Sequence, residues 1–165
     1  MTVPLRDTAE FKRGRNGEQI VADWLKRGGW YVIPSYDYNG DDDHPPRMEG
    51  WTRRFIIPDL DACKGGRRIW VEVKTKAAPS LHRATNILEH GIPLRHYEQY
   101  LQVELETGCA VYLLICEEQS SQLLYQKLSE LGQPRIYSGG KMSVGGMAFW
   151  PRASFHILPR RRAQS

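Results

Sequence analysis

Apolar residues at helical spacing predict two helices, one over residues 7–27 and one over residues 93–107. The first begins with Asp7 and, three positions later, Glu10, a pattern that resembles a capping box, and a glycine pair follows the helix. The second begins at a proline, which suits the first turn of a helix, and a glycine follows it. A third, shorter helix is predicted over residues 121–131.

Strands are predicted where aromatic and β-branched residues run together. They cover residues 30–34, 55–63, 69–76, 110–116, 134–137 and 147–158. The pair Gly65-Gly66 lies between the second and third of these runs and is typical of a hairpin turn. The run 110–116 is continuously apolar, as in a strand buried on both faces. Because a helix precedes it, a crossover could make it parallel to a hairpin strand.

The order of these elements is αβββαβ with a C-terminal addition, which predicts an α/β protein with a mixed central sheet flanked by helices. The length of 165 residues fits one domain. We expect a core over about residues 7–117, an addition over 118–158 and a basic tail over 159–165. The segments 36–53 and 77–92 are polar or irregular and are predicted to be loops.

Charge and cysteine content narrow the class of protein only slightly. The 23 Lys and Arg residues exceed the 19 Asp and Glu residues, and the net charge of +4 permits a polyanionic partner without requiring one. No apolar stretch could span a membrane and the first residues lack a secretory pattern, so we expect a soluble, cytoplasmic protein without a membrane partner. Cys63, Cys109 and Cys116 suit reduced core residues rather than disulfides or a zinc site.

The hairpin is expected to bring two acidic residues together. If Gly65-Gly66 form a two-residue turn, counting back along both strands makes Asp59 face Glu72, with Cβ atoms ~5 Å apart. Lys74 shares the face of Glu72 because strand side chains alternate. Two facing carboxylates repel unless a cation lies between them, and Mg²⁺, which prefers oxygen ligands, is the obvious candidate. Lys74 could also simply neutralise the pair.

A third acidic residue, Glu18, falls on the apolar arc of the first predicted helix when residues are placed at about 100° intervals. A carboxylate that faces the core needs a partner, and a metal site at the sheet edge or a lysine would supply one. Gly14 and Gly17 would let this helix approach another backbone, or a phosphate, closely.

Three short motifs follow one another along the predicted αβββαβ order: Gly17-Glu18, Pro58-Asp59 and Glu72-Val73-Lys74. Together they resemble the motifs of the PD-(D/E)xK nuclease superfamily, which has the restriction-endonuclease-like fold. The resemblance covers about residues 7–117. Within that superfamily, the small Holliday-junction resolvases and phage-type endonucleases are the most similar.

The resemblance implies a single nuclease-like domain: a magnesium-dependent endodeoxyribonuclease that hydrolyses phosphodiester bonds in DNA, including structured or branched DNA. It implies that Asp59, Glu72 and the backbone carbonyl of Val73 bind Mg²⁺, which Mn²⁺ could replace. Lys74 would orient or activate the attacking water, and Glu18 would assist the metal or the water. A homodimer would supply the two sites needed to cut both strands at once.

Candidate contacts to nucleic acid surround the hairpin and the second helix. The cationic ones suit phosphate binding or, alternatively, protection of an edge strand. Those on the flank of the helix could touch phosphate or base, or could merely be exposed. The candidates are Arg53, Arg54, Lys64, Arg67, Arg68, Lys76, His96, Gln99 and Tyr100. Trp51, in the first polar loop, is a candidate for stacking on a base.

Two other functions fit the same residues. The fold could serve a non-catalytic nucleic-acid-binding module, although an intact acidic pair with a lysine favours catalysis. An unrelated α/β interaction domain would carry Asp59 and Glu72 as surface residues. Asp61 is interpreted as a solvated edge residue rather than an accessory ligand, and the three aspartates 41–43 as part of a polar loop.

Overall fold

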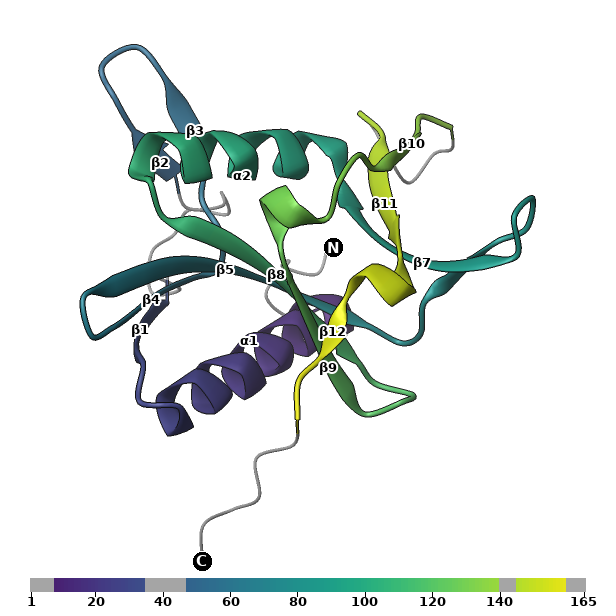
Figure 1. Cartoon of the computed structure of the whole chain (residues 1–165), viewed down its shortest axis with the longest axis horizontal. Helices are drawn as coiled ribbons and strands as arrows, with labels where there is room; N and C mark the ends of the chain where they lie inside the picture. The colour runs from purple at the N-terminus through teal and green to yellow at the C-terminus, as the bar shows by residue number, and fades with distance from the viewer. Residues whose placement is uncertain (1–7, 35–46, 140–144, 160–165) are drawn as a thin grey trace, which may run out of the picture.

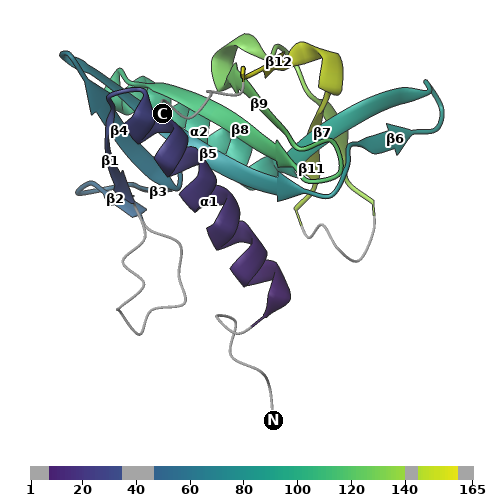
Figure 2. The ribbon, with the colours of Figure 1, turned by 90° about the horizontal axis from the view of Figure 1, so that it is seen from below.

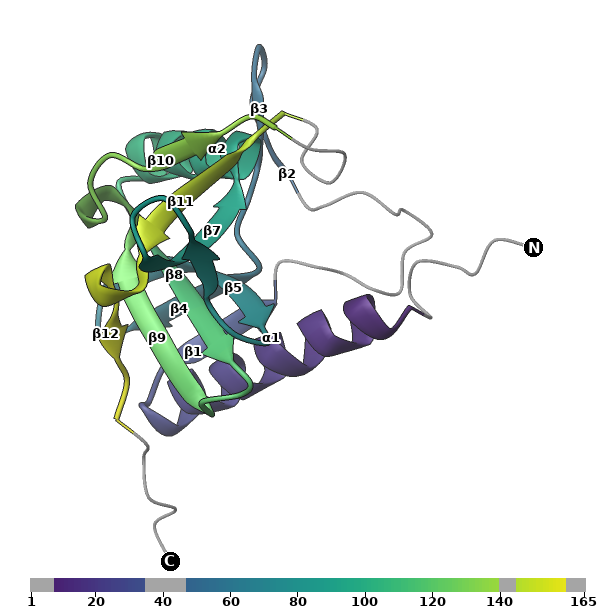
Figure 3. The ribbon, with the colours of Figure 1, turned by 90° about the vertical axis from the view of Figure 1, so that its right-hand side faces the viewer.

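The computed structural model describes residues 8–34, 47–139 and 145–159, which form three layers. Helix α1 (Ala9–Arg27) covers one face of a central sheet, and helix α2 (Leu94–Thr107) covers the other together with a smaller sheet (Figures 1 and 3). Figure 2, seen from the side of α1, shows this helix lying across the central strands. The predicted α/β architecture, a mixed sheet between helices, is confirmed.

In the described residues, strands and 3₁₀ turns make up the elements between and after the helices. The strands are β1 (Tyr31–Pro34), β2 (Arg47–Glu49), β3 (Arg54–Ile56), β4 (Leu60–Lys64), β5 (Arg67–Lys76), β6 (Ser80–His82), β7 (Ile87–Pro93), β8 (Ala110–Glu117), β9 (Gln122–Lys127), β10 (Arg135–Tyr137), β11 (Met147–Pro151) and β12 (His156–Ile157). The 3₁₀ turns are η2 (Leu128–Glu130) and η3 (Arg152–Ser154).

The central sheet has the strand order β1-β4-β5-β8-β9-β12 and contains the predicted hairpin in the predicted register. β4 and β5 pair antiparallel from Lys64 with Arg67 to Leu60 with Val71. The turn residues Gly65-Gly66 both have positive φ, which a two-residue turn of this kind requires. β8 runs parallel to β5, with α2 in the crossover, as predicted.

Helix α1 packs closely on the central strands. Val21 is fully buried and packs in one cluster with Val71 and Val73 of β5. A Cβ atom at Gly17 would lie 2.0 Å from the Oγ1 atom of Thr75, so the helix can take this position only with glycine there. The close approach expected at Gly17 is therefore present, but to a threonine side chain rather than to a backbone. The same expectation is wrong for Gly14, where no atom lies within 4 Å of an added Cβ.

The larger core lies between the central sheet, α2 and a second sheet of order β10-β11-β7-β6. Trp150 of β11, Ile92 of β7, Val103 of α2 and Ile115 of β8 are all fully buried in it. Gly108 ends α2 in the left-handed conformation, with φ of 63°, so the chain can turn back into β8. This core fixes α2 over the middle of the sheet.

Two predicted boundaries change because of local backbone chemistry. The strand predicted over 55–63 is broken into β3 and β4, since Pro58 has no N–H to donate to a neighbouring strand. Helix α1 is capped by Thr8, whose hydroxyl accepts the Phe11 N–H at 3.2 Å, rather than by Asp7. Asp7 lies outside the described residues.

Three other predictions are wrong because these segments form hairpins whose turns lack the glycine pair that marks the β4–β5 turn. The predicted loop 36–53 contains β2, which pairs with β3. The segment 77–92 forms the hairpin of β6 and β7. The helix predicted over 121–131 is instead β9, the partner of β8, followed by η2. The three aspartates 41–43 lie outside the described residues.

Two further sequence expectations concern the thiols and the hydropathy of the helices. Cys63, Cys109 and Cys116 are all free, as predicted, and Cys116 is buried between α1 and the sheet. The expected core position is wrong for Cys63, which is exposed near the end of β4, and Cys109 is only half-buried. None of the helices in the described ranges combines the length and the apolar character needed to cross a bilayer.

Candidate active site

Asp59 lies where the pairing of β4 with β5 ends. The last pair joins Leu60 to Val71, so beyond Val71 this edge of β5 has no β4 partner. The Asp59 side chain occupies that edge, and its Oδ2 atom accepts the Val73 N–H at 2.8 Å. Because the N–H and C=O of one strand residue point to the same edge, the Val73 carbonyl lies beside Asp59.

Glu72 is buried under α2 with a relative exposure of 1%. The Tyr100 hydroxyl donates to its Oε2 atom at 2.7 Å. The Lys74 ammonium forms an ion pair with the other oxygen, Oε1. Groups from a helix and from the strand itself therefore hold the carboxylate in one orientation.

Asp59 and Glu72 form a pair of buried acids whose charge Lys74 offsets only in part. Asp59 is 6% exposed, and burial, followed by the charge of Glu72, raises the pKa of Asp59 well above its usual value. Burial alone would lower the pKa of Lys74, but the charges of Glu72 and Asp59 outweigh it and raise that pKa. The site thus keeps its lysine protonated and has excess negative charge that a cation would offset.

Glu18 adds a third acid to this cluster from α1. Its side chain is 16% exposed, and its negative charge acts on both Asp59 and Lys74. Arg15 lies one helical turn away, with its Nη1 atom 3.4 Å from Glu18 Oε2. Of the four residues that the sequence predicted to be catalytic, Asp59, Glu72 and Lys74 therefore lie together, and Glu18 lies near enough to act on them through its charge.

Helix α2 contributes a tyrosine and a histidine that the sequence analysis assigned to nucleic-acid contact. The Nδ1 atom of His96 lies 3.3 Å from the Tyr100 oxygen, and burial lowers the pKa of His96. Tyr100 is 2% exposed and its hydroxyl reaches Glu72, so it acts inside the site rather than at the surface. Their spacing of four residues puts both rings on one helix face, and this spacing is the feature of the sequence that links them.

The donor set fits Mg²⁺ rather than a metal that needs a closed cage of ligands. Within the described ranges, no three His, Cys, Asp or Glu side chains gather closely enough to hold a metal ion. Asp59, Glu72 and the Val73 carbonyl would supply a few oxygen ligands, and Mg²⁺ commonly binds one or two carboxylates while keeping several waters. The burial of two acids beside a single lysine is the observation that favours a cation here.

The predicted cationic contacts at the hairpin turn lie away from the acids. At ~3.3 Å per residue along β5, Arg67 is ~16 Å from Glu72. Lys64 donates to the Gly28 carbonyl at 2.5 Å, which ties the turn to the end of α1. Arg68 donates two hydrogen bonds to Asp61, at 3.0 and 2.7 Å. Lys64 and Arg68 are therefore already engaged within the protein.

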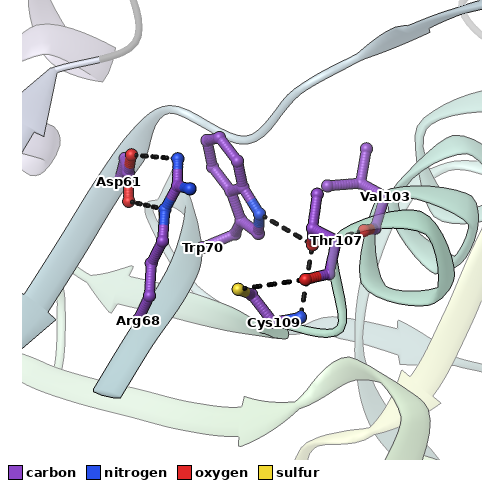
Figure 4. Close-up of polar contacts among 6 residues, drawn as sticks. All are labelled: Asp61, Arg68, Trp70, Val103, Thr107 and Cys109. Atoms are coloured by element: carbon purple, nitrogen blue, oxygen red, sulfur yellow. Dashed lines mark hydrogen bonds and ion pairs between the residues drawn. The ribbon is translucent and has the colours of Figure 1, made fainter. Parts of the chain in front are cut away.

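Figure 4 shows how the region around Arg68 is joined to α2. The Arg68 guanidinium lies over the Trp70 ring, 5.0 Å from its centre. The indole N–H of Trp70 donates to Thr107 Oγ1 at 3.2 Å, at the last residue of α2. The Asp61 carboxylate is thus paired with Arg68 within the sheet.

The remaining predicted contacts lie closer to the acids along the chain. Arg53 and Arg54 are exposed and precede the Pro58-Asp59 motif, and Lys76 follows Lys74 on the same face of β5. Gln99 faces the protein instead: its Oε1 atom accepts the Ile56 N–H at 2.6 Å and ties α2 to β3.

The layers, the mixed sheet and the position of the acids define the restriction-endonuclease-like fold. The structure is similar to Hjc, a Holliday junction resolvase from the archaeal hyperthermophile Archaeoglobus fulgidus, with a TM-score of 0.57 and 15% sequence identity over 86% of this chain and 90% of the resolvase. It is also similar to a nuclease from a fusselovirus, with a TM-score of 0.49 and 11% identity over 96% of this chain and 90% of that one. No family model and no curated protein matches the sequence. The likeness to the resolvase confirms the fold that the sequence motifs predicted.

Proposed function

We propose that this protein is a metal-dependent endonuclease that hydrolyses phosphodiester bonds in DNA. The observation that carries the proposal is the meeting of Asp59, Glu72 and Lys74 at the open edge of β5. Two buried acids beside a lysine cost folding free energy, and clusters with strongly perturbed pKa values gather at functional sites. The fold shared with a Holliday junction resolvase supports DNA as the substrate.

Asp59, Glu72 and the Val73 carbonyl would hold Mg²⁺, or Mn²⁺ in its place. A bound divalent ion would polarise the scissile phosphate and lower the pKa of the attacking water. Glu18 would add negative charge beside the ligands and help to orient that water. Two such sites are needed to cut both strands at once, so we propose a homodimer as the form that cleaves duplexes.

Lys74 and the residues of α2 would serve the reaction in different ways. Lys74 is kept protonated by its acidic neighbours, so it would donate hydrogen bonds to the water or the phosphate rather than take up a proton. Tyr100 would be a positioning residue that holds Glu72 in the orientation needed for the metal. His96 would in turn hold the Tyr100 hydroxyl.

A non-catalytic nucleic-acid-binding module is the second candidate. The observation in its favour is that Tyr100 and Lys74 engage both oxygens of Glu72 within the protein. A cluster that satisfies itself in this way could persist without metal. Such a module would bind nucleic acid and leave it intact.

The test is cleavage of supercoiled plasmid and of synthetic branched DNA with Mg²⁺, with Mn²⁺ and with a chelator. We expect cleavage only with the metals, and a loss of at least about 100-fold in Asp59→Ala and Lys74→Ala. Glu106→Gln and Lys12→Ala change an exposed acid and an exposed lysine outside the site and are the matched controls.

Two results would overturn the assignment. Binding without cleavage on every DNA form would favour the binding module. Cleavage by Asp59→Ala and Lys74→Ala at the rate of the wild type would show that the chemistry lies elsewhere.

A further inference from the structure

The β2–β3 hairpin ends in a fully exposed tryptophan, Trp51. The tip is closed by a hydrogen bond from the Gly50 N–H to the Arg53 carbonyl, at 2.7 Å. Figures 1 and 3 show the hairpin projecting beyond α2. Tryptophan is among the most buried residues on average, and this one adds nothing to either core. Its place at a projecting tip indicates a partner that offers a flat or apolar face.

The surroundings of Trp51 indicate that the partner is polyanionic. Glu49 is the one acidic residue between positions 47 and 56. The arginines of the same segment are Arg47, Arg53 and Arg54. In the parts of the chain that the structure describes, these three form no ion pair, whereas Arg68 is bonded to Asp61. Free guanidinium groups around an aromatic ring match a nucleic acid, which has phosphates and flat bases, better than an apolar protein surface.

The root of the hairpin is fixed to the body of the protein. Its apolar residues pack against the larger core: these are Met48, Phe55 and Ile56. The bond from the Ile56 N–H to Gln99 ties the same strand to α2. Trp51 is therefore mounted on an anchored arm rather than on a free loop.

The same arm leads directly into the candidate active site. Trp51 and Asp59 are separated by so few residues that, at no more than ~3.6 Å each, their Cα atoms lie at most ~29 Å apart. At about 3.4 Å per base pair, this corresponds to ~8 base pairs of duplex. A base held by Trp51 would thus lie less than one helical turn from the phosphate at Asp59.

We propose that Trp51 stacks on an unpaired base of the substrate while Arg53 and Arg54 bind the neighbouring phosphates. Inside a continuous duplex both faces of each base are already covered, but an unpaired base leaves a face open to an aromatic ring. The selected substrate class is therefore DNA with a single-stranded extension or flap, rather than a four-way junction whose arms are fully paired. The part of this inference that concerns cleavage rests on the proposed nuclease function.

Binding measured in a chelator tests the stacking without cleavage. The probes are a blunt duplex, a four-way junction and a duplex with a single-stranded extension, with 2-aminopurine as the first unpaired base of the extension. We expect Trp51→Ala to lose roughly tenfold or more in affinity for the extended duplex and to lose the quenching of 2-aminopurine. Its affinity for the blunt duplex and the junction should change by less than about twofold, and Trp51→Phe should keep most of the affinity. Tyr31→Ala, at another exposed aromatic residue, is the matched control.

The arginines should behave differently from the tryptophan. Arg53→Gln with Arg54→Gln should weaken the binding of all three DNA forms and reduce the slope of log affinity against log salt by about two. Arg83→Gln, an exposed arginine at the tip of the β6–β7 hairpin, is the matched control.

Cleavage then separates this inference from the proposed function. With Mg²⁺, the wild type should cut the extended duplex within about 8 nucleotides of the first unpaired base, and Trp51→Ala should lose that preference. If nothing is cut but the binding results hold, the nuclease proposal fails and Trp51 remains a base-binding residue. If DNA is cut and Trp51→Ala binds and cleaves all three DNA forms as the wild type does, the proposed role of Trp51 is overturned. A Trp51→Ala variant that changes only self-association would place a second protein chain on the hairpin and overturn it as well.

Discussion

The Tyr100 hydroxyl fixes Glu72 from the helix side of the candidate site. Its bond of 2.7 Å reaches a buried carboxylate oxygen, so it contributes more than a bond at the surface would. Lys74 approaches the other oxygen from the strand. The fold therefore sets the orientation of this carboxylate as well as its charge, which is what a metal ligand requires.

Tyr100→Phe removes this hydroxyl and keeps the ring. We expect the apparent affinity for Mg²⁺, measured from cleavage rates at increasing Mg²⁺, to fall about 10- to 100-fold. The metal-free protein should also lose about 1–3 kcal/mol of stability to urea, because a buried oxygen is left without its donor. Tyr97→Phe changes a tyrosine of the same helix that packs edge-on against Trp150, and it should alter the Mg²⁺ dependence little. Equal shifts in both variants would rule out a specific role for Tyr100.

Gly17 and Gly14 should respond to alanine with opposite signs. At Gly17 the new Cβ atom would lie 2.0 Å from Thr75 Oγ1, so α1 must move, and we expect a loss of about 1–3 kcal/mol. At Gly14 no atom lies within 4 Å of the new Cβ, so alanine should gain up to about 1 kcal/mol from helix propensity. Urea unfolding of both variants measures this. A gain at Gly17 would mean that the helix does not sit this close to β5.

At the scale of elements, a buried acid joins the end of β8 to the second sheet. Glu117 accepts hydrogen bonds from Arg152 of η3, at 2.7 and 2.8 Å, and from Ser120, at 2.7 Å. It also lies 2.6 Å from Nε2 of His90 in β7. Burial alone would raise the pKa of Glu117, but these bonds, led by those from Arg152, lower it to about 2. The ionised carboxylate therefore stabilises the contact between the two sheets.

Acid should weaken this contact between the sheets. A carboxyl whose pKa falls from 4.5 to about 2 on folding contributes fully above pH 4.5, and that stability is lost as the pH falls towards 2. The shift corresponds to on the order of 3 kcal/mol. Urea unfolding between about pH 6 and pH 3 should show the loss, and Glu117→Gln should be less stable at pH 6 with a flatter dependence on pH. A profile as steep as that of the wild type would assign the acid sensitivity to other carboxylates.

The hairpin that could be predicted from the sequence is the one with a clear turn signal. The Gly65-Gly66 turn sets the β4–β5 register by itself, because both of its residues need positive φ. The helix predicted over residues 121–131 is wrong because a short apolar run has no decisive period, and β9 forms only where β8 offers an edge. The β6–β7 hairpin has Leu81 facing Leu88, but its turn lacks a glycine signal.

The candidate site contains one contact that could be predicted from the sequence and one that could not. The closeness of Asp59 and Glu72 could be counted from the register of one hairpin, but the ladder ends at Leu60 and Val71, so the two acids do not face each other as a strand pair. The Asp59 carboxylate instead accepts the Val73 N–H. The contact of Tyr100 with Glu72 depends on where α2 crosses the sheet, and that is decided by the packing of the larger core. Periodicity identified the side of α2 to which Tyr100 belongs but not the strand residue that it meets.

At the scale of the whole molecule, a chain of net charge +4 surrounds a cluster that is locally negative. The basic hairpin would attract a DNA backbone, while Asp59 and Glu72 would repel the phosphate that arrives between them. A bound divalent cation removes this conflict. For the same reason, the negative charge of the site should lower the stability of the folded protein when no metal is bound.

Asp59→Asn should therefore stabilise the metal-free protein at neutral pH. The pKa of Asp59 is raised above its usual 3.8 by burial and then by Glu72, so the ionised group costs stability above pH 3.8, and in full above its folded pKa. Asparagine keeps an oxygen that can accept the Val73 N–H, and it carries no charge. The gain should consequently disappear in acid, where Asp59 is protonated in the wild type as well.

Mg²⁺ should make the wild type more stable than Asp59→Asn, the reverse of their order without metal. It binds the folded wild type, so the unfolding temperature of the wild type should rise with Mg²⁺ concentration as mass action requires, while that of Asp59→Asn should respond much less. Thermal unfolding at neutral pH with and without Mg²⁺ measures both effects, and Glu106→Gln, at an exposed acid outside the site, should follow the wild type. If the wild type does not respond to Mg²⁺ and is the more stable protein without it, the acids are stabilised by the fold alone and no metal is needed to explain them.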